Sequence, residues 1–352
     1  MASNAKVVRV RKAGSGDSFA LIPGNTADFS VELGSADDTI FGASYTSTQT
    51  TLGSWEISSN ALYRGFAGYN SVIKKTASPT PISNKPMSVE DGNTYIINDI
   101  SLTPWDWNED IIVSDDEGPI SSDEIKAIDP LFGRVTFVDG FTPDGNVTVD
   151  AVVLGLVPFG KAMSFDLSQT CDTTETTSFE VAQANGGYST HRPTLREVSL
   201  SLSAFYRSDA EFLALLDSRE KFVVEINPDG EGKSIARGVF RIQNESNSGD
   251  VGGDEETSVE FVLAVPEGFV PFSWYHDSTT TMPVGLRRIL DAYVNQDNLD
   301  VEYLPEGVGN LGKGGEVVLT DASISSSVDG IVEASFSAMG TGVFTVLNEV
   351  AS

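Results

Sequence analysis

The sequence predicts a mainly β protein that contains two copies of one strand-rich repeat and a small extra β-domain. Three observations support this prediction. Apolar residues alternate with polar ones over long stretches, which is typical of strands with one buried and one solvated face. Helix signals are few. Residues 224–261 resemble residues 301–338 at a constant offset and without a gap, and such self-similarity indicates a duplicated architecture.

Length and charge narrow the functional classes. The chain has 352 residues, of which 40% are hydrophobic, enough for about two or three domains of roughly 150 residues. It carries 51 Asp and Glu against 22 Lys and Arg, a net charge of −29 that repels duplex DNA. The one basic cluster lies in an N-terminal arm, residues 1–26, which we expect to be either a solvated tail or an arm that binds a partner (Lys6, Arg9, Arg11 and Lys12).

Two strands and two helices have the clearest signals. Residues 54–63 place Trp55, Ile57, Ser59, Ala61 and Tyr63 on one face. Residues 196–206 do the same with Val198, Leu200, Leu202, Ala204 and Tyr206. The opposite faces are polar and carry Glu56, Ser58, Glu197, Ser199 and Ser201. Helices are predicted over 208–219, where Ser208 and Glu211 form a capping box, and over 283–294.

The stretch Gly232-Lys233-Ser234 resembles the end of a phosphate-binding loop. The first glycine of that motif is replaced by Asn227, and the residues that follow alternate as in a strand instead of forming a helix. The second copy of the repeat keeps the glycines but lacks the Lys-Ser pair. We therefore interpret the glycines as parts of a turn between two strands.

The remaining candidate sites are weak. His191 and His276 are too few for a histidine-rich metal site or a serine triad, so we expect surface or interface roles. Cys171 lies in a polar stretch that we interpret as a loop, without a nearby base. The acidic stretch 114–124 lacks calcium-loop spacing and is expected to be a solvated turn. The sequence predicts no catalytic set, no metal site and no cofactor.

The repeat extends toward the N-terminus. Residues 30–39 resemble 164–173, and residues 54–64 resemble 198–207, with Ala61 and Tyr63 over Ala204 and Tyr206. We infer a first repeat split between 27–70 and 280–352, and a continuous second repeat over 159–270. Between them, residues 71–158 contain a Pro-rich linker at 78–86 and an inserted β-domain at 87–156.

The inserted β-domain contains Trp105 and Trp107, which would face the same side of a strand. Such a pair is typical of a sugar-binding platform, but a packed core or a domain interface is the interpretation we favour. An acidic pair near these tryptophans would be needed for glycoside hydrolysis, and no one pair stands out.

These features together resemble the tail tube proteins, also called major tail proteins, of long non-contractile-tailed bacteriophages. The resemblance rests on the strand, hairpin, helix and Gly-turn order of each repeat and on the closing "SVDGIVEASFSAMGTGVF" at 327–344. It implies a β-sandwich or barrel for each repeat, with one short flanking helix, whose long strands join those of neighbours around a channel.

The resemblance also implies function and partners. It implies stacked rings that form the tail tube of a virion and deliver the genome, so DNA would pass transiently and without specific binding. Two repeats per chain imply a trimeric ring with pseudo-six-fold symmetry, with the tape measure, tail tip and terminator proteins as further partners. The residues expected to line the channel are Glu56, Ser58, Glu197 and Ser199; the alternative is that they face a neighbouring domain.

Other functions remain open from the sequence. A baseplate hub, tail terminator or decoration protein would share many of these features, and a carbohydrate-binding or hydrolytic protein is less favoured. No apolar run reaches the roughly 18 residues that a membrane span needs, and no secretory signal is visible. Synthesis and assembly in the host cytoplasm and a final location in the virion are therefore expected.

Overall fold

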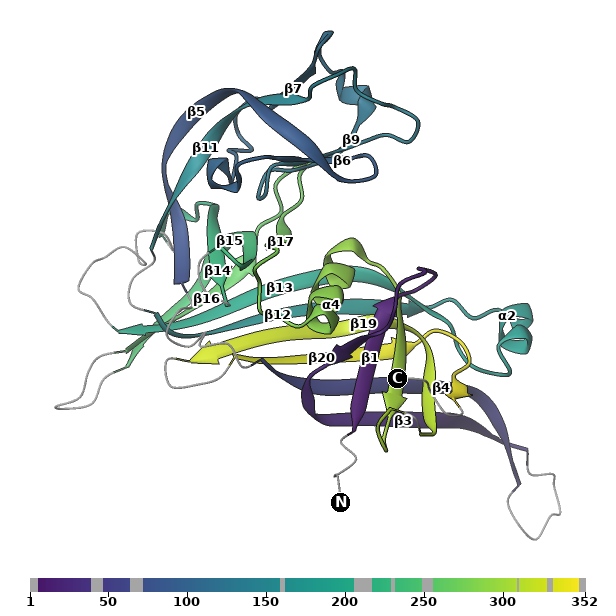
Figure 1. Ribbon diagram of the computed structural model, residues 1–352. Coiled ribbons are helices and arrows are strands. Elements are labelled where there is room, and N and C mark those ends of the chain that lie inside the picture. The colour runs from purple at the N-terminus through teal and green to yellow at the C-terminus, as the bar shows by residue number, and fades with distance from the viewer. Residues whose placement is uncertain are drawn as a thin grey trace. The chain divides into compact units, whose positions relative to one another are not determined.

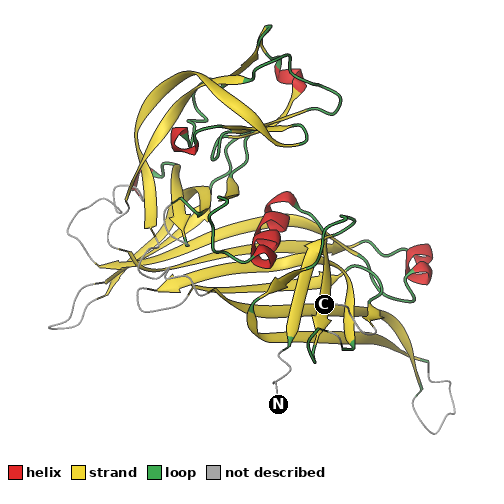
Figure 2. Ribbon diagram, in the orientation of Figure 1, coloured by secondary structure: helices red, strands yellow, loops and turns green. Residues whose placement is uncertain are grey.

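A computed structural model shows a mainly β protein, as the sequence predicts (Figures 1 and 2). It describes residues 6–38, 47–63, 72–158, 162–205, 217–228, 232–248, 256–308, 310–327 and 332–347. The chain forms two compact units. Unit 1 comprises Met1–Gly68, Asp166–Val198 and Thr281–Ser352, and unit 2 comprises Tyr69–Phe165 and Ser199–Thr280.

Unit 1 is built around one antiparallel sheet with the strand order β2–β1–β18–β19–β20–β4–β3. Two more strands pair with β19. They are β12 and the short β21, which pairs with the first residues of β19. The bounds are β1 Val7–Lys12, β2 Ala20–Ile22, β3 Gly24–Asp37, β4 Thr48–Tyr63, β12 Ala162–Glu175, β18 Leu299–Leu304, β19 Gly312–Ser327, β20 Val332–Gly340 and β21 Thr345–Leu347.

Helix α4 (Val284–Asn295) confirms the helix predicted at 283–294. Its buried residues recur at helical spacing and include Leu286, Ile289 and Tyr293. The Tyr293 hydroxyl lies 2.9 Å from the carbonyl oxygen of Thr170 and 2.8 Å from that of Glu197. Burial raises the pKa of Tyr293. The apolar side of the helix therefore covers the buried face of the sheet in unit 1.

Strand β13 (His191–Phe205) follows β12 and contributes residues to both units. The two strands lie side by side in Figure 1, and the Thr194 hydroxyl donates to the Asp172 carbonyl at 2.9 Å. Between them lies α2 (Phe179–Ala184), a short helix capped by Ser178 that the sequence analysis did not predict. The helix predicted at 208–219 lies mostly outside the described residues.

The N-terminal arm is not a solvated tail over residues 7–12. These residues form β1, which pairs with β18 on one side and β2 on the other. Arg9 donates to Glu302, Arg11 to Asp300, and Lys12 forms an ion pair with Asp297. The arginines and lysine that suggested a free arm therefore neutralise carboxylates from the other end of the chain.

Unit 2 contains the inserted β-domain and the strands β14 to β17. Strand β11 pairs with β5 and β7, β10 pairs with β6 and β9, and β5 also pairs with β6 and with β14. The bounds are β5 Val72–Asp91, β6 Thr94–Ile97, β7 Ile112–Asp115, β8 Gly118–Pro119, β9 Ile125–Asp129, β10 Arg134–Phe137, β11 Thr148–Pro158, β14 Phe222–Asn227, β15 Ser234–Ser248, β16 Glu256–Leu263 and β17 Phe272–His276. Two short 3-10 helices, η1 Ile100–Leu102 and η2 Ser122–Glu124, complete it.

The Pro-rich stretch 78–86 is part of a strand and not a linker. It lies within β5, where Pro79, Pro81 and Pro86 stand opposite Leu154, Val152 and Thr148 of β11. In the described pairings, the other edge of β5 is unpaired over 76–85. Proline is tolerated on an edge strand because the missing N–H is not needed by a second neighbour.

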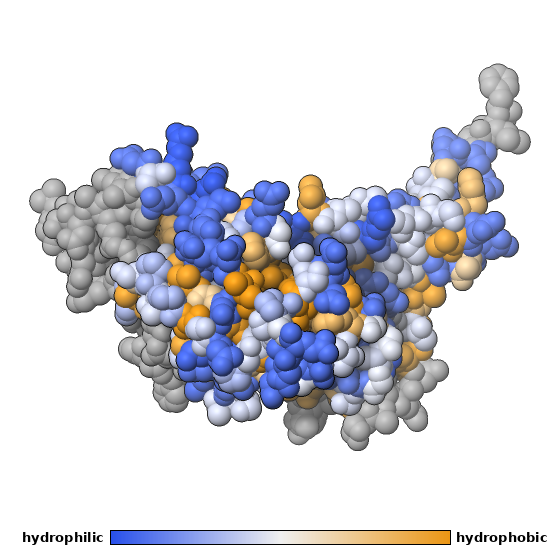
Figure 3. All heavy atoms as spheres, turned by 90° about the horizontal axis from the view of Figure 1, so that it is seen from above, coloured by the Kyte–Doolittle hydropathy of each residue, from blue (hydrophilic) through white to orange (hydrophobic). Residues whose placement is uncertain are grey.

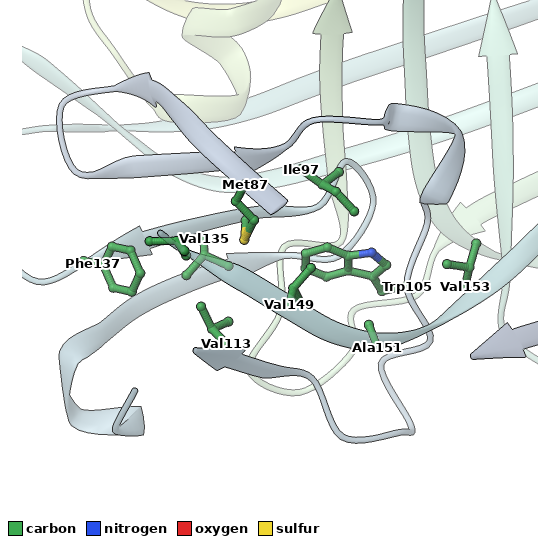
Figure 4. Packing of buried hydrophobic residues seen from close by; sticks show 10 residues of the cluster. Met87, Ile97, Trp105, Val113, Val135, Phe137, Val149, Ala151 and Val153 are labelled. Carbon is green, nitrogen blue, oxygen red and sulfur yellow. The ribbon is translucent and has the colours of Figure 1, made fainter. Parts of the chain in front are cut away.

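Trp105 belongs to the core of the inserted β-domain, as the favoured interpretation predicted. It is 0% exposed, and its indole N–H donates to the Leu102 carbonyl at 3.0 Å. Figure 4 shows it among Met87, Ile97, Val149 and other apolar side chains. Trp107 packs against a different cluster, which includes Leu131 and Phe132. The two tryptophans therefore do not form a solvent-facing platform for a sugar.

A buried ion pair lies beside that second cluster. The Arg237 guanidinium contacts Glu225 Oε2 at 2.7 and 2.8 Å and donates to Thr103 Oγ1 at 2.6 Å. It also donates to the Leu131 carbonyl and lies over the Phe132 ring. Residues of the inserted β-domain thus complete the hydrogen bonding of a charge carried by β15, within unit 2.

Candidate functional site

The internal repeat has the same strand register in both copies. Val224 of β14 pairs with Gly238 of β15, and at the equivalent positions Val301 of β18 pairs with Gly315 of β19. Even the irregularity in the next pair recurs. The β15–β16 ladder shifts between Ile242 and Asn244, and the β19–β20 ladder shifts at the equivalent positions, between Leu319 and Asp321. A shared register and a shared bulge indicate that both copies have one local fold.

In each repeat, a strand from its N-terminal part pairs with the last strand of the ladder, and the two pairings are equivalent. Ile57 of β4 stands opposite Ala338 of β20, and Leu200 of β13 stands opposite Phe261 of β16. Each pair lies where the alignment of 54–64 with 198–207 places it. Strands β4 and β20 therefore join segments from the two ends of the chain in one sheet.

The turn that contains Gly232, Lys233 and Ser234 has no phosphate-loop geometry. Ser234 begins β15, so a strand and not a helix follows the turn. Gly232 has a φ of 81°, and Gly307 of the second copy, which corresponds to Gly230, has a φ of 86°. A positive φ is a reason for glycine in a turn between strands. The Ser234 hydroxyl contacts the hydroxyl of Thr280 and Nδ1 of His276.

The unit 1 sheet has one buried and one polar face. On the buried face, Trp55, Ile57, Phe336 and Ile324 are at most 2% exposed. The alternate positions form what we call the polar face: every second residue of 28–32 in β3, 54–60 in β4, 321–325 in β19 and 333–339 in β20. Apart from Met339, these positions hold only Asp, Glu, Ser and Asn.

The polar face is acidic and lacks cationic residues. Its carboxylates come from all four strands, and no Lys or Arg occupies any of its described positions (Asp28, Glu32, Glu56, Asp321 and Glu333). Burial raises the pKa of Asp321, and the nearby Asp166 of β12 raises it further. Burial also raises the pKa of Asp166. The negative charges on this part of the sheet therefore repel one another without a compensating cation.

The predicted site residues fall on polar faces. Glu56 is exposed and Ser58 is half-buried, and they stand opposite Met339 and Ser337 of β20. Glu197, in unit 1, is exposed on the polar side of β13. Ser199, in unit 2, stands opposite Val262 of β16. The sequence analysis missed Asp28, Asp166, Asp321 and Glu333. The same alternation, applied to 28–32, 164–170 and 321–339, would have found them.

The other candidate residues have structural roles. Cys171 lies in strand β12 and not in a loop, because it continues the buried alternation of Leu167 and Gln169; burial raises the pKa of its thiol. His191 Nδ1 lies 3.1 Å from the Gly340 carbonyl oxygen, and the His276 ring stacks on Trp274. Acidic residues 114–124 form β7, β8 and a capped turn with mostly exposed side chains.

The described residues contain neither a cluster of metal ligands nor a membrane-spanning helix. No group of three or more His, Cys, Asp or Glu side chains there is arranged to hold a metal ion. No helix within the described ranges is long and apolar enough to cross a membrane. The face shown in Figure 3 is largely hydrophilic, with hydrophobic side chains gathered near the middle of the view.

Comparisons with known proteins give matches among solved structures. No family model matches the chain, and no curated protein sequence matches it. Among solved structures, it is similar to a chain from the virion of a native gene transfer agent particle. The identity is 18%, the match covers 34% of this chain and 88% of that chain, and the TM-score is 0.28. A chain from the tail of an empty gene transfer agent particle, solved with C6 symmetry, gives the same identity and TM-score with 86% of that chain covered.

Proposed function

We propose that this chain is a structural virion protein that oligomerises into stacked rings and forms the tube of a phage tail. The observation that carries the proposal is the duplicated repeat, with the same register and the same bulge in both copies. Two equivalent repeats in one chain let three chains form a closed ring with pseudo-six-fold symmetry. Closed symmetric assemblies also remove exposed sheet edges.

The polar face supports a role as the channel wall. Glu56 and Ser58 lie on it, and Glu197 and Ser199 lie on the polar side of β13. A wall in which carboxylates and hydroxyls predominate repels the phosphate backbone, so DNA passes without being held. We therefore propose that these four side chains line the lumen and that the protein acts in genome delivery to the host.

The proposal includes a passive role for this chain. It acts without catalysis and without a cofactor, in contact with copies of itself and with the tape measure, tail-tip and terminator proteins. It is made and assembled in the host cytoplasm and remains in the virion. A baseplate hub of related architecture is the principal alternative, and it differs from a tube protein in copy number.

Electron microscopy of the purified protein at high concentration tests the proposal. We expect stacked rings around an open channel, with three chains per ring in class averages. The number of copies per virion then separates a tube protein, which is abundant, from a hub or terminator, which is present in few copies. A protein that stays monomeric at every concentration, including in a mixture with isolated tail tips, would contradict the proposal.

A further inference from the structure

The two repeats differ in the exposure of two pairs of equivalent apolar side chains. Leu33 of β3 corresponds to Leu167 of β12 in the alignment of 30–39 with 164–173. Leu167 is 0% exposed, whereas Leu33 is 56% exposed. The preceding apolar residues behave alike, because Phe165 is 4% exposed and Val31 is 38% exposed. This apolar surface is therefore buried on β12 of the second repeat and exposed on β3 of the first.

Part of this cover comes from a neighbouring strand. Strand β12 pairs with β19, and the Gln169 amide donates to the Ala322 carbonyl at 3.2 Å. Strand β3 pairs with β4 alone among the described pairings, so its outer edge has no partner there. An edge without a described partner strand that carries the exposed side chains of Val31 and Leu33 is a surface on which another strand can pair.

Strand β3 lacks a neighbour equivalent to β19, the strand that pairs with β12. The repeat contains a second strand of this kind, β15. Strand β15 corresponds to β19, which pairs with β12 beyond its ladder with β18. On the corresponding side of β15, the ladder with β14 ends at Phe240, and no described strand pairs with residues 241–248 there. Glu245, which corresponds to Ala322, has a buried Oε2 atom that finds no hydrogen-bond partner among the described residues. Both features are expected of an edge that is completed by another molecule.

We infer that β3 of one copy pairs with the free edge of β15 in a second copy, at a junction equivalent to the β12–β19 junction within the chain. This inference rests on the proposed ring and specifies which edges close it. Internal junctions between β12 and β19 would alternate with intermolecular junctions between β3 and β15. The partner is thus a second copy of this chain, joined by main-chain hydrogen bonds and by burial of Val31 and Leu33.

The substitution Leu33→Lys tests the junction in the full-length chain. Leu33 is exposed in the single chain, so a lysine there is expected to leave the thermal unfolding temperature unchanged. At the junction the lysine would be buried, so the variant is expected to lose the ring species in size-exclusion chromatography with light scattering. Val89→Lys is the matched control, because Val89 is 58% exposed on β5, a strand whose described pairings include neither β3 nor β15. The control is expected to form rings like the wild type.

Crosslinking gives a second readout. A chain with Leu33→Cys, Glu245→Cys and Cys171→Ala is treated with a bis-thiol reagent that spans about 8 Å, the distance between diagonal neighbours on adjacent strands. We expect covalent dimers and trimers. Replacing Glu245→Cys by Asn244→Cys moves the thiol to the opposite face of β15 and is expected to abolish the crosslink.

The outcomes separate this inference from the proposed function. Wild-type rings that persist in Leu33→Lys and give no crosslink would overturn the β3–β15 junction but leave the tube proposal intact. A wild-type chain that never forms rings would overturn both. Ring loss in Leu33→Lys alone, with the expected crosslink pattern, supports both.

Discussion

Gly340, the last residue of β20, lies directly against the indole of Trp55. A Cβ atom added at Gly340 would lie 2.1 Å from Cε2 of Trp55, which is only 2% exposed. The same indole donates its N–H to the Gly342 carbonyl at 2.8 Å. The segment 340–342, at the end of β20, is therefore held on the buried face of the unit 1 sheet by Trp55 of β4.

The substitution Gly340→Ala is expected to destabilise the protein. Neither the ring of Trp55 nor the paired backbone of β20 can move away cheaply, and overpacking of this kind costs about 1–3 kcal/mol. Chemical denaturation measures the change in the free energy of unfolding. Gly16→Ala is the control, because a Cβ at Gly16 meets nothing within 4 Å. Equal stability of the two variants would contradict the close packing.

Removal of the Arg237 charge is expected to destabilise unit 2 strongly. Arg237→Met leaves the buried Glu225 carboxylate without its ion pair, and breaking a buried pair in this way costs about 3–5 kcal/mol. The double variant Arg237→Met with Glu225→Leu removes both charges and is expected to recover much of that loss. Urea unfolding of the single and double variants measures the coupling. A double variant that is less stable than Arg237→Met would contradict the explanation that the unpaired Glu225 carboxylate causes the loss.

Asp321→Asn is expected to stabilise the protein at neutral pH. The folded state raises the pKa values of Asp321 and Asp166 above the ordinary value of 3.8, so folding favours their protonated forms. The contribution of these two carboxyl groups to the free energy of unfolding is present below pH 3.8 and is lost as the pH rises through their raised pKa values. The gain at pH 7, screened by solvent, is at most about 1 kcal/mol.

Thermal unfolding between pH 3.5 and 7 checks this prediction. The advantage of Asp321→Asn should shrink as the pH falls, because the wild-type carboxyl groups become protonated. Asp28→Asn, an exposed position on the same polar face, is the control. A loss of stability in Asp321→Asn at pH 7 would show that its carboxylate is stabilising instead.

The variant Glu56→Lys with Ser58→Lys tests the acidic channel wall. Assembly should be unaffected if these side chains face the lumen, but two lysines should let the tubes bind duplex DNA at low salt. Fluorescence anisotropy with a labelled duplex measures the binding and its decrease with added salt. The control, Ser122→Lys with Asp123→Lys, makes the same change in charge at exposed positions of η2. Equal DNA binding by both variants would contradict a special role for the polar face.

Local patterns in the sequence predict a large part of this fold. Alternation predicts the buried and polar sides of β4 and β13, because successive side chains of a strand point to opposite faces. The spacing of Leu286, Ile289 and Tyr293 predicts α4 in the same way, through the helical period. The constant offset between 224–261 and 301–338 predicts the repeat, because similar sequences with equivalent turns adopt equivalent strand registers.

Long-range contacts decide the features that the sequence analysis got wrong. The arm at 7–12 is a strand because Arg9 and Arg11 meet Glu302 and Asp300, near the other end of the chain. The Pro-rich stretch is a strand because β11 supplies hydrogen bonds along one edge of β5. Cys171 is buried because α4 and β19 cover the face of β12 that it shares with Gln169.

By itself, the sequence determined the mainly β class, the two repeats and the alternation that makes one face of each long strand polar. These properties depend on side chains close together in the chain, and local geometry is sufficient to predict them. Only the tertiary structure decided which equivalent residues are covered, as Leu167 is and Leu33 is not. Burial depends on the strand that lies alongside, and no local pattern specifies that neighbour.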